Sequence, residues 1–448
     1  MKTNVSLGTV QDIKFRKVLK FVFPTYLTSL FNTLYTIIDG IYVSRYVSTD
    51  SLAAINTVYP LVNILTGIAL AFATGGSAIA AIDIGKGDRE KAAKTFSISV
   101  ILAVLVGWLF SIAALFNFSW ILKILGATSV TISDCRIYGF LWLAAAPAAV
   151  GKELCTYFIR VDGSPKWSFA TALSGGVLNI FLDHIFVARL HMGIVGAGLA
   201  TVLGLVLSCI IGVFYFGVKA KNLRFTVKKL HILPGLRCMV NGSSECIDQL
   251  AIAVTTIVFN RTALNIAGEN GIAAVSIIMY LQFLFIGIYF GYSMGISPLL
   301  SYSFGEGKRE IRYKLEHYSY CFFSVVPVIL YAVTYFCAPF AILFFAPKDS
   351  AVFEISLTGM RLYGLGFLFS GFNILAAVRL TAYGKGYYSG IITFLRSFAL
   401  LLLFLLVLPP IYGINGMWMA VPVAEVVTLG ISLWSLKKDV NSRYVEIT

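Results

Sequence analysis

The chain has little charge, and little of that charge is acidic. Of 448 residues, 12% are charged and 58% are hydrophobic, with 35 Lys and Arg against 21 Asp and Glu. The mean hydropathy is +0.85. A soluble protein of this length cannot bury so much apolar surface, because its cores stop growing and divide into domains. The composition therefore excludes a soluble enzyme and a disordered chain, and it predicts a polytopic membrane protein.

Cysteine and nucleotide motifs are also scarce. Seven cysteines lie singly in apolar runs, without a C-x-x-C pair or a Cys/His cluster, which excludes a disulfide framework and a zinc site. The sequence has no P-loop, no G-x-G-x-x-G after a strand and no H-E-x-x-H. A membrane protein without an ATP site can drive an uphill process only with an ion gradient. We therefore expect no cofactor other than a coupling ion, H⁺ or Na⁺.

Long apolar runs fill most of the sequence. Since a span needs about 20 mostly apolar residues, we predict twelve, near 21–43, 52–82, 95–116, 130–158, 166–188, 194–218, 234–264, 271–302, 316–344, 351–378, 388–410 and 414–436. Lipid offers no hydrogen-bond partner to an open sheet edge, so all twelve are expected to be helices. The predicted fold class is an all-α polytopic membrane protein.

The basic residues lie in short segments between these runs, which argues against a nucleic-acid partner despite the net charge of +14. With the N-terminus inside, 25 of the 35 Lys and Arg fall on the cytoplasmic side and seven fall in outer loops and helix ends. This asymmetry predicts a multi-pass cell (inner) membrane protein with both termini in the cytoplasm. Its remaining partners would be membrane lipids, and we expect a monomer.

The chain repeats itself at one offset. Three segments recur 220 residues later: 85–90 at 305–310, 193–200 at 413–420, and 52–55 at 272–275. A unit of six spans enters the membrane in the same direction twice, so the halves are parallel repeats, an arrangement typical of secondary transporters. We predict an N-terminal six-helix lobe (1–218), a cytoplasmic linker (219–233), a C-terminal six-helix lobe (234–436) and a cytoplasmic tail (437–448).

Acids inside spans are costly and are functional candidates by default. Asp39 in the first span and Asp183 in the fifth lie at nearly the same depth, in the outer half of the first lobe. Asn179 lies one turn before Asp183, and Tyr35 and Asn32 lie one and two turns before Asp39. Such a set could hold a proton or Na⁺, with Asp39 and Asp183 as metal ligands in the second case. The alternative is that one acid only caps a helix or meets water of an outer loop.

Polar residues also lie within spans of the second lobe. Glu245 opens the seventh span, with Asp248 and Gln249 on its face, and it is a candidate contact for a cation or substrate. The alternative is an acid wetted near the cytoplasmic end. Gln282 and Asn373 lie well inside spans as further candidates for substrate binding, as does Asn32 in the first lobe. Arg396 is expected to pair with an acid, and Glu425 is one option.

Pro24 lies in the same predicted helix as Asp39. Proline removes a backbone hydrogen bond, so we expect a kink there. Two interpretations stay open, a static kink and a bend linked to protonation of the acid.

Together these features resemble the multidrug and toxic compound extrusion (MATE) family. The resemblance rests on twelve spans in two parallel halves, the matched G-x-G-x-x-E loops after the second and eighth spans, the 193–201 motif and an Asp late in the first span. The segments 241–245, 268–270 and 297–302 are similar to the bacterial branch. The resemblance covers the chain from about Phe21 to Leu436.

The resemblance implies a V-shaped antiporter that exports organic cations against H⁺ or Na⁺ by alternating access. It implies a coupling site at Asp39 and Asp183, and a possible match of Glu245 to an acid used by some relatives. Other relatives carry acids deep in the tenth span, where this chain has Asn373, and that departure favours coupling in the N-terminal lobe. The alternatives are a flippase for lipid-linked cell-wall or polysaccharide precursors, and a membrane enzyme or receptor. Neither a basic cavity nor clustered catalytic residues stand out in the sequence.

Overall fold

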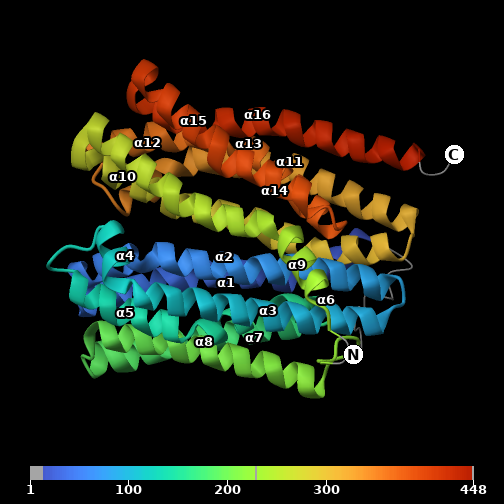
Figure 1. Ribbon diagram of the computed structural model, residues 1–448. Helices are drawn as coiled ribbons and strands as arrows, with labels where there is room; N and C mark the ends of the chain where they lie inside the picture. Colours follow the sequence, from blue (N-terminus) through green and yellow to red (C-terminus); the bar gives the residue numbers. More distant parts are fainter. Residues whose placement is uncertain (1–13, 228–229, 446–448) are drawn as a thin grey trace.

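A computed structural model describes residues 14–227 and 230–445; within it, the side chains of Thr49, Tyr280, Leu284 and 435–445 are not described. The first 13 residues of the predicted N-terminal lobe, positions 228–229 of the predicted linker and 446–448 of the predicted tail lie outside these ranges. The described residues form helices joined by short turns (Figure 1).

The N-terminal half consists of eight α-helices and one π-helix. They are α1 (Phe15–Tyr46), α2 (Thr49–Gly85), α3 (Arg89–Phe116), α4 (Phe118–Ile124), α5 (Ile132–Ala144), α6 (Ala146–Val161), α7 (Pro165–Asp183), η2 (His184–Arg189) and α8 (Gly193–Val218). Asp88 caps α3, since its side chain accepts a hydrogen bond from the backbone of Lys91. The short helix α4 falls between predicted spans.

The C-terminal half also consists of eight α-helices and one π-helix. Its elements are α9 (Ile232–Asn241), α10 (Ser243–Gly305), α11 (Arg309–Leu343), α12 (Ala351–Gly364), α13 (Phe367–Ala382), α14 (Gly386–Phe394), η3 (Leu395–Ala399), α15 (Leu400–Val407) and α16 (Pro409–Val445). The 63-residue α10 is two helices joined at Gly268, whose φ of 61° breaks the helical path. Only glycine adopts this conformation readily.

The described helices agree with twelve spans. Nine of them are long and apolar enough to cross a membrane singly, and the pair α12 and α13, bent by 47°, makes a tenth. Division of α10 at Gly268 adds an eleventh, and α5 with α6, interrupted only at Ala145, adds the twelfth. The predicted all-helical membrane fold is confirmed, whereas the breaks inside single spans were not predicted from the sequence.

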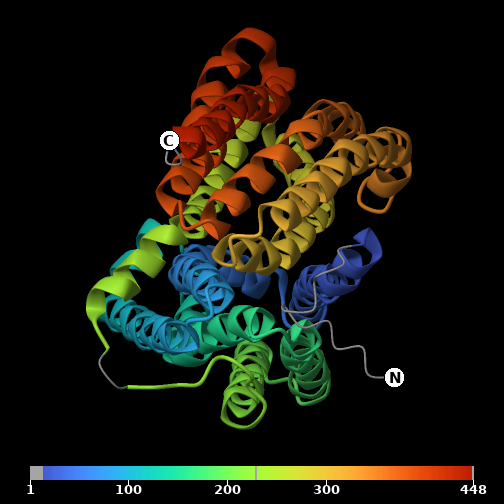
Figure 2. The same ribbon diagram turned by 90° about the vertical axis from the view of Figure 1, so that its right-hand side faces the viewer.

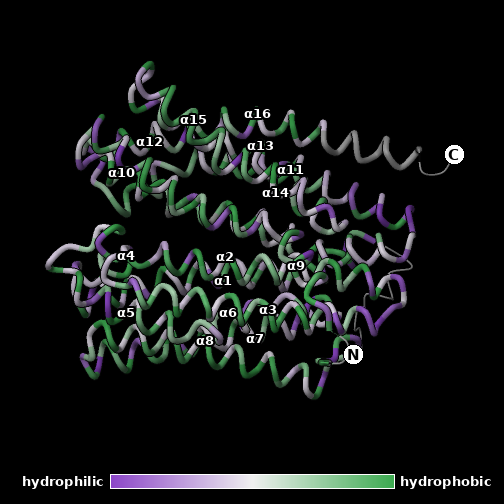
Figure 3. The backbone as a smooth tube through the Cα atoms, in the orientation of Figure 1, coloured by the Kyte–Doolittle hydropathy of each residue, from purple (hydrophilic) through white to green (hydrophobic). Residues whose placement is uncertain are grey.

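The helices run side by side in two groups, α1–α8 and α10–α16, while α9 packs mainly on α2 and α3 of the first group (Figures 1 and 2). The groups meet at the end that carries the α2–α3 and α10–α11 turns and diverge toward the other end. We call the first end the basic end, after Lys86, Arg89, Lys308 and Arg309 in or beside these turns. Figure 3 shows polar residues at the helix ends and apolar residues between them, as expected for helices surrounded by lipid. The cytoplasmic location of the basic end and the lobe boundaries stay predictions.

The backbone repeats at the offset seen in the sequence. Gly87 and Gly307 have φ values of 83° and 73°, and Gly193 and Gly413 have 61° and 58°. Each pair is 220 residues apart, and each residue adopts the left-handed conformation that favours glycine. The recurring glycines therefore set equivalent turns in both halves.

Glycines also bring the halves into backbone contact at the basic end. A β-carbon at Gly85 would lie 2.3 Å from the carbonyl oxygen of Tyr302, and one at Gly305 would lie 2.1 Å from that of Ile82. A β-carbon at Gly75 would lie 2.4 Å from the backbone nitrogen of Gly242. No larger residue fits such spacings without movement, so the halves close on one another here through glycine.

Helix α1 contacts both halves. Near the basic end, Val18, Phe21 and Val22 belong to the buried core of the C-terminal half. The hydroxyl of Ser29 then donates to the carbonyl of Gly287 on α10 at 3.1 Å. Farther along, α1 packs on α7. Although α1 starts in the N-terminal half of the sequence, it is thus a physical link between the two groups.

The connection from α8 to α9 runs along the outside of the N-terminal half (Figure 2) and is anchored by Asp162. This fully buried carboxylate accepts hydrogen bonds from the backbone of Lys221, Asn222 and Leu223 at 2.6–3.0 Å and from the hydroxyl of Tyr215 at 2.7 Å. Such charge-assisted bonds are strong.

We expect Asp162→Ala to lower the free energy of unfolding by about 2–4 kcal/mol, because it leaves several partly buried N–H groups without an acceptor. The thermal unfolding midpoint of the purified protein in detergent measures this. Asp50→Ala, at an exposed position in the first turn of α2, is the control and should change the midpoint little. Equal midpoints for the two variants would contradict the anchoring role.

Candidate cation site

The structure brings Asp39 of α1 and Asp183 of α7 together. Their carboxyl groups are close enough to interact directly, and the side chain of Asn179 lies beside Asp39. Asp183 is fully buried and Asn179 is 3% exposed. Two adjacent carboxyl groups can form a hydrogen bond with one another only when one of them carries a proton. The predicted pair at one depth is therefore present as a contact, and its role stays a prediction.

Glycines set the close approach of the helices that carry these residues. A β-carbon at Gly176 of α7 would lie 2.4 Å from the ring of Phe31 on α1, and 3.4 Å from that of Tyr35. Asp39 follows Tyr35 by four residues and Asp183 follows Gly176 by seven, so both acids lie on the facing sides of these helices. Tyr35 thus packs beneath the pair.

A second glycine contact positions Asn179. A β-carbon at Gly175 of α7 would lie 2.4 Å from the carbonyl oxygen of Gly204 on α8. One turn away, the amide nitrogen of Asn179 lies 3.4 Å from the hydroxyl oxygen of Thr201, which in turn donates to the carbonyl of Ala197. Because that hydroxyl proton is used, Thr201 offers a lone pair toward Asn179.

Thr201 and Tyr138 are site residues that the sequence reasoning did not single out. Tyr138 of α5 is buried and lies near Asp39 and Thr201. Thr201 belongs to the 193–201 motif, which was the available signal for it.

The site holds several acceptor atoms without donors. Within the described residues, Oδ1 of Asp39, Oδ1 of Asn179 and both carboxylate oxygens of Asp183 are buried and accept no hydrogen bond. Buried polar groups are normally paired, and an unpaired one costs about 1–3 kcal/mol. Four such oxygens in one place form a set that a proton or a small hard cation would satisfy.

The donor set suits Na⁺ or H⁺ rather than a transition metal. No group of three or more His, Cys, Asp and Glu side chains gathers anywhere in 14–227 or 230–445. The site offers two carboxylates, an amide oxygen and a hydroxyl, which are hard ligands. The π-helix η2 begins directly after Asp183, and such distortions are frequent at functional sites.

Arg396 forms a buried ion network in the C-terminal half. Its Nη2 lies 3.2 Å from Oδ1 of Asp248, and its Nη1 lies 3.5 Å from Oε1 of Glu425. The predicted pairing with Glu425 is confirmed, and Asp248 is an additional partner. Asn373 donates to Oε2 of Glu425 at 2.7 Å and accepts from Ser432 at 2.8 Å. Asn373, predicted as a substrate contact, therefore lies in this network.

The other predicted substrate contacts are spread along the bundle. Glu245 is 9% exposed at the start of α10, next to Asp248 and Arg396. Gln249 is half-buried and packs near Gly67 of α2, where the halves meet. Gln282 accepts a hydrogen bond of 2.5 Å from the hydroxyl of Tyr363. Asn32 is half-buried on α1. Of these four residues, only Glu245 lies beside the Arg396 network. The predicted roles of all four in substrate binding stay predictions.

Pro24 is buried within α1, which runs as one helix from Phe15 to Tyr46. Its carbonyl accepts a hydrogen bond from the hydroxyl of Thr28 at 2.9 Å. Pro24 lies where α1 packs on the C-terminal half, before the part that packs on α7. Whether it bends with the state of Asp39 stays a prediction.

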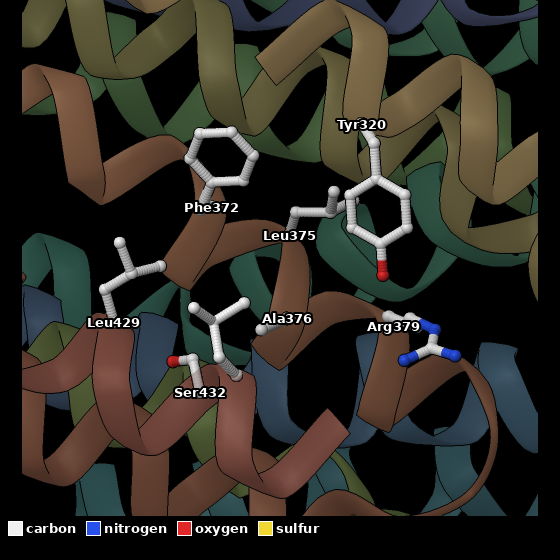
Figure 4. Close-up of a pocket in the computed structure, with 8 residues that line it drawn as sticks. Tyr320, Phe372, Leu375, Ala376, Arg379, Leu429 and Ser432 are labelled. Carbon is white, nitrogen blue, oxygen red and sulfur yellow. The ribbon is translucent and has the colours of Figure 1, made fainter. Parts of the chain in front are cut away.

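A pocket in the C-terminal half lies between α11, α13 and α16 (Figure 4). Arg379 lies at one end of it, and its Nε is paired with Oε1 of Glu316 at 2.9 Å. Most other lining residues, such as Phe372, Leu375 and Leu429, are apolar. Since its one guanidinium already has a carboxylate partner, this pocket offers a ligand no free charge.

Comparison with known proteins points to one family. The MatE family model matches residues 24–185 and again 246–407. The multidrug export protein MepA of Staphylococcus haemolyticus (strain JCSC1435) is 25% identical over 432 residues, covering 94% of this chain and 92% of that protein. MepA of Staphylococcus aureus (strain MRSA252) is 23% identical over 423 residues, covering 92% and 91%.

Solved structures share the fold. A MATE protein crystallised in a bent conformation superposes with a TM-score of 0.90 at 22% identity over 100% of both chains. An outward-facing multidrug resistance MATE family transporter of the MOP superfamily gives 0.89 at 22% identity over 98% of both. The two matches of the family model fall one in each half, as the internal repeat requires. The resemblance inferred from the sequence is confirmed: the chain belongs to the MATE family of multi-pass membrane transporters.

Proposed function

We propose that this chain exports organic cations in exchange for H⁺ or Na⁺, with Asp39 and Asp183 as the coupling site and no other cofactor. The observation that carries the proposal is the group of four buried acceptor oxygens without donors at Asp39, Asn179 and Asp183. Two ionised carboxylates in contact repel each other, and the fully buried one, Asp183, also loses its hydration. A bound proton or Na⁺ removes both penalties.

The packing of α1 supports a mechanical link between this site and the rest of the molecule. Asp39 lies on the part of α1 that packs on α7, whereas Ser29 bonds to Gly287 of α10 in the other half. Occupancy of the site removes the repulsion between Asp39 on α1 and Asp183 on α7. A shift of α1 would then reach α10 directly, and the two halves would alternate between two arrangements.

The substrate class comes from the relatives and from charge. The two MepA proteins are named as multidrug export proteins. In this chain the buried Glu245 provides a carboxylate for a cationic substrate. The flippase alternative, which needs free basic groups for pyrophosphate, loses support because Arg396 pairs with acids and Lys152 pairs with Glu153 at 2.6 Å.

Efflux from proteoliposomes that contain the purified chain tests this function. We expect ethidium to move against its concentration gradient when a proton or a sodium gradient of opposite direction is imposed, and the rate to vanish when that gradient is collapsed. Liposomes without protein are the control. Ethidium movement that is equally fast without any ion gradient would contradict the exchange mechanism.

A further inference from the structure

Three acids surround one base where α10, η3 and α16 meet. Arg396 is paired with Asp248 and Glu425, and the three side chains are only 10–16% exposed. Ser397 also donates to Asp248, and Asn373 donates to Glu425. Asp248 and Glu425 therefore already have a cation and hydrogen-bond donors.

The third acid, Glu245, has no such partner. It lies one turn before Asp248 on the same face of α10, is 9% exposed and experiences the charges of Asp248 and Arg396. Within the described residues, no hydrogen bond or ion pair reaches its carboxylate. An unpaired acid in a residue that is nine-tenths buried is costly, and a positive group that comes to it lowers that cost.

An aromatic ring from the other half lies at the same place. Tyr157 of α6 is close enough to Glu245 for their charges to interact, and its ring stacks 4.7 Å from the guanidinium carbon of Arg160. The guanidinium of Arg160 donates to the carbonyl of Met294 on α10 at 3.1 Å, which fixes α6 against α10. Glu245 therefore lies at the junction of the two halves, where a substrate could reach it.

We propose that Arg396 is a specificity-determining residue: its positive charge pairs with both Asp248 and Glu425 and offsets part of their negative charge, so that Glu245 is the carboxylate left to accept the substrate's charge, and singly charged organic cations are favoured over doubly charged ones. A fixed positive charge repels a bound dication about twice as strongly as a monocation at the same place. Removal of that charge therefore helps the dication more, and it also frees Asp248, one turn from Glu245, for a second ammonium group.

This inference rests on the proposed export of organic cations, and binding to the purified protein tests it apart from transport. The probes are butyltrimethylammonium, with one charge, and butane-1,4-bis(trimethylammonium), which carries a second charge at the other end of the same short chain. We expect Arg396→Gln to tighten binding of the first about tenfold and of the second about a hundredfold. Calorimetric titration in detergent measures both dissociation constants.

Three further variants separate specificity from folding. Arg396→Lys keeps the charge and should keep the wild-type ratio of the two constants. The double variant Arg396→Gln/Asp248→Asn removes one acid with the base and should return the ratio toward wild type, even if Arg396→Gln alone is unstable. Asp39→Asn should leave the ratio unchanged even if it stops transport. The proposal is overturned if Arg396→Gln changes both dissociation constants equally, or if Arg396→Lys loses the preference for the singly charged probe. It is also overturned if the double variant is as selective for the dication as Arg396→Gln alone, or if the wild-type protein binds neither probe.

Discussion

Asp39→Asn is expected to reduce gradient-driven ethidium export by about tenfold or more. Asparagine has nearly the same shape as aspartate but cannot alternate between a charged and a neutralised form. In the variant, Asp183 no longer faces a second carboxylate, so the site no longer needs a bound proton or Na⁺ to relieve the repulsion. Binding of the cation then stops depending on the ion gradient. Initial rates of ethidium efflux from proteoliposomes under an imposed gradient measure the effect.

Asp183→Asn should give a similar loss, because either carboxyl group alone lacks the repulsion that makes the site bind a cation. Asp50→Asn is the matched control, since Asp50 is exposed in the first turn of α2. It should export at the wild-type rate. If Asp39→Asn and Asp50→Asn behaved alike at equal protein content, the coupling role of Asp39 would be wrong.

The second large effect is expected at the basic end, where Gly305→Ala should separate the two halves. The new β-carbon would lie 2.1 Å from the carbonyl oxygen of Ile82, far inside contact distance, and both atoms belong to the backbone or are fixed to it. Overpacking of this kind costs about 1–3 kcal/mol. If export requires this end to close and open, the closed arrangement becomes less populated. Export then falls by the factor to which this free energy corresponds.

Spin labels at the exposed positions Lys86 and Arg309, one in each half, report the separation at this end. We expect their distance distribution to shift to longer values in Gly305→Ala and in Gly85→Ala. Gly217→Ala and Gly430→Ala are the controls, because a β-carbon at either position meets open space. Unchanged distances in all four variants would show that the glycine contact does not hold the halves together.

Much of the fold could be predicted because lipid removes most alternatives. Apolar runs of sufficient length must be helices, and an even number of spans per repeat fixes parallel halves. The structure adds breaks that hydropathy does not register. The fourth span is interrupted at Ala145 and the tenth is bent near Leu365, again 220 residues apart. Both breaks lie within apolar sequence, so no change in composition marks them.

The candidate site was predictable in part for a similar reason. A buried acid in a span is rare enough to stand out, which identified Asp39 and Asp183. Thr201 and Tyr138 did not stand out, since a threonine or a tyrosine in a membrane helix carries no charge penalty. Their place beside the acids depends on contacts between helices such as that of Gly175 with Gly204, and such contacts have no signature in a single sequence. The two partners of Arg396 could not both be inferred for the same reason.

Cation stoichiometry of the purified protein tests the central claim most directly. Proton uptake in a pH-stat and binding of ²²Na⁺ should be measured for the wild type and for the Asp39→Asn/Asp183→Asn double variant at the same ionic strength. The account predicts that the wild type binds one more cation per chain, either H⁺ or Na⁺, than the variant. Equal cation binding by two folded proteins would contradict it.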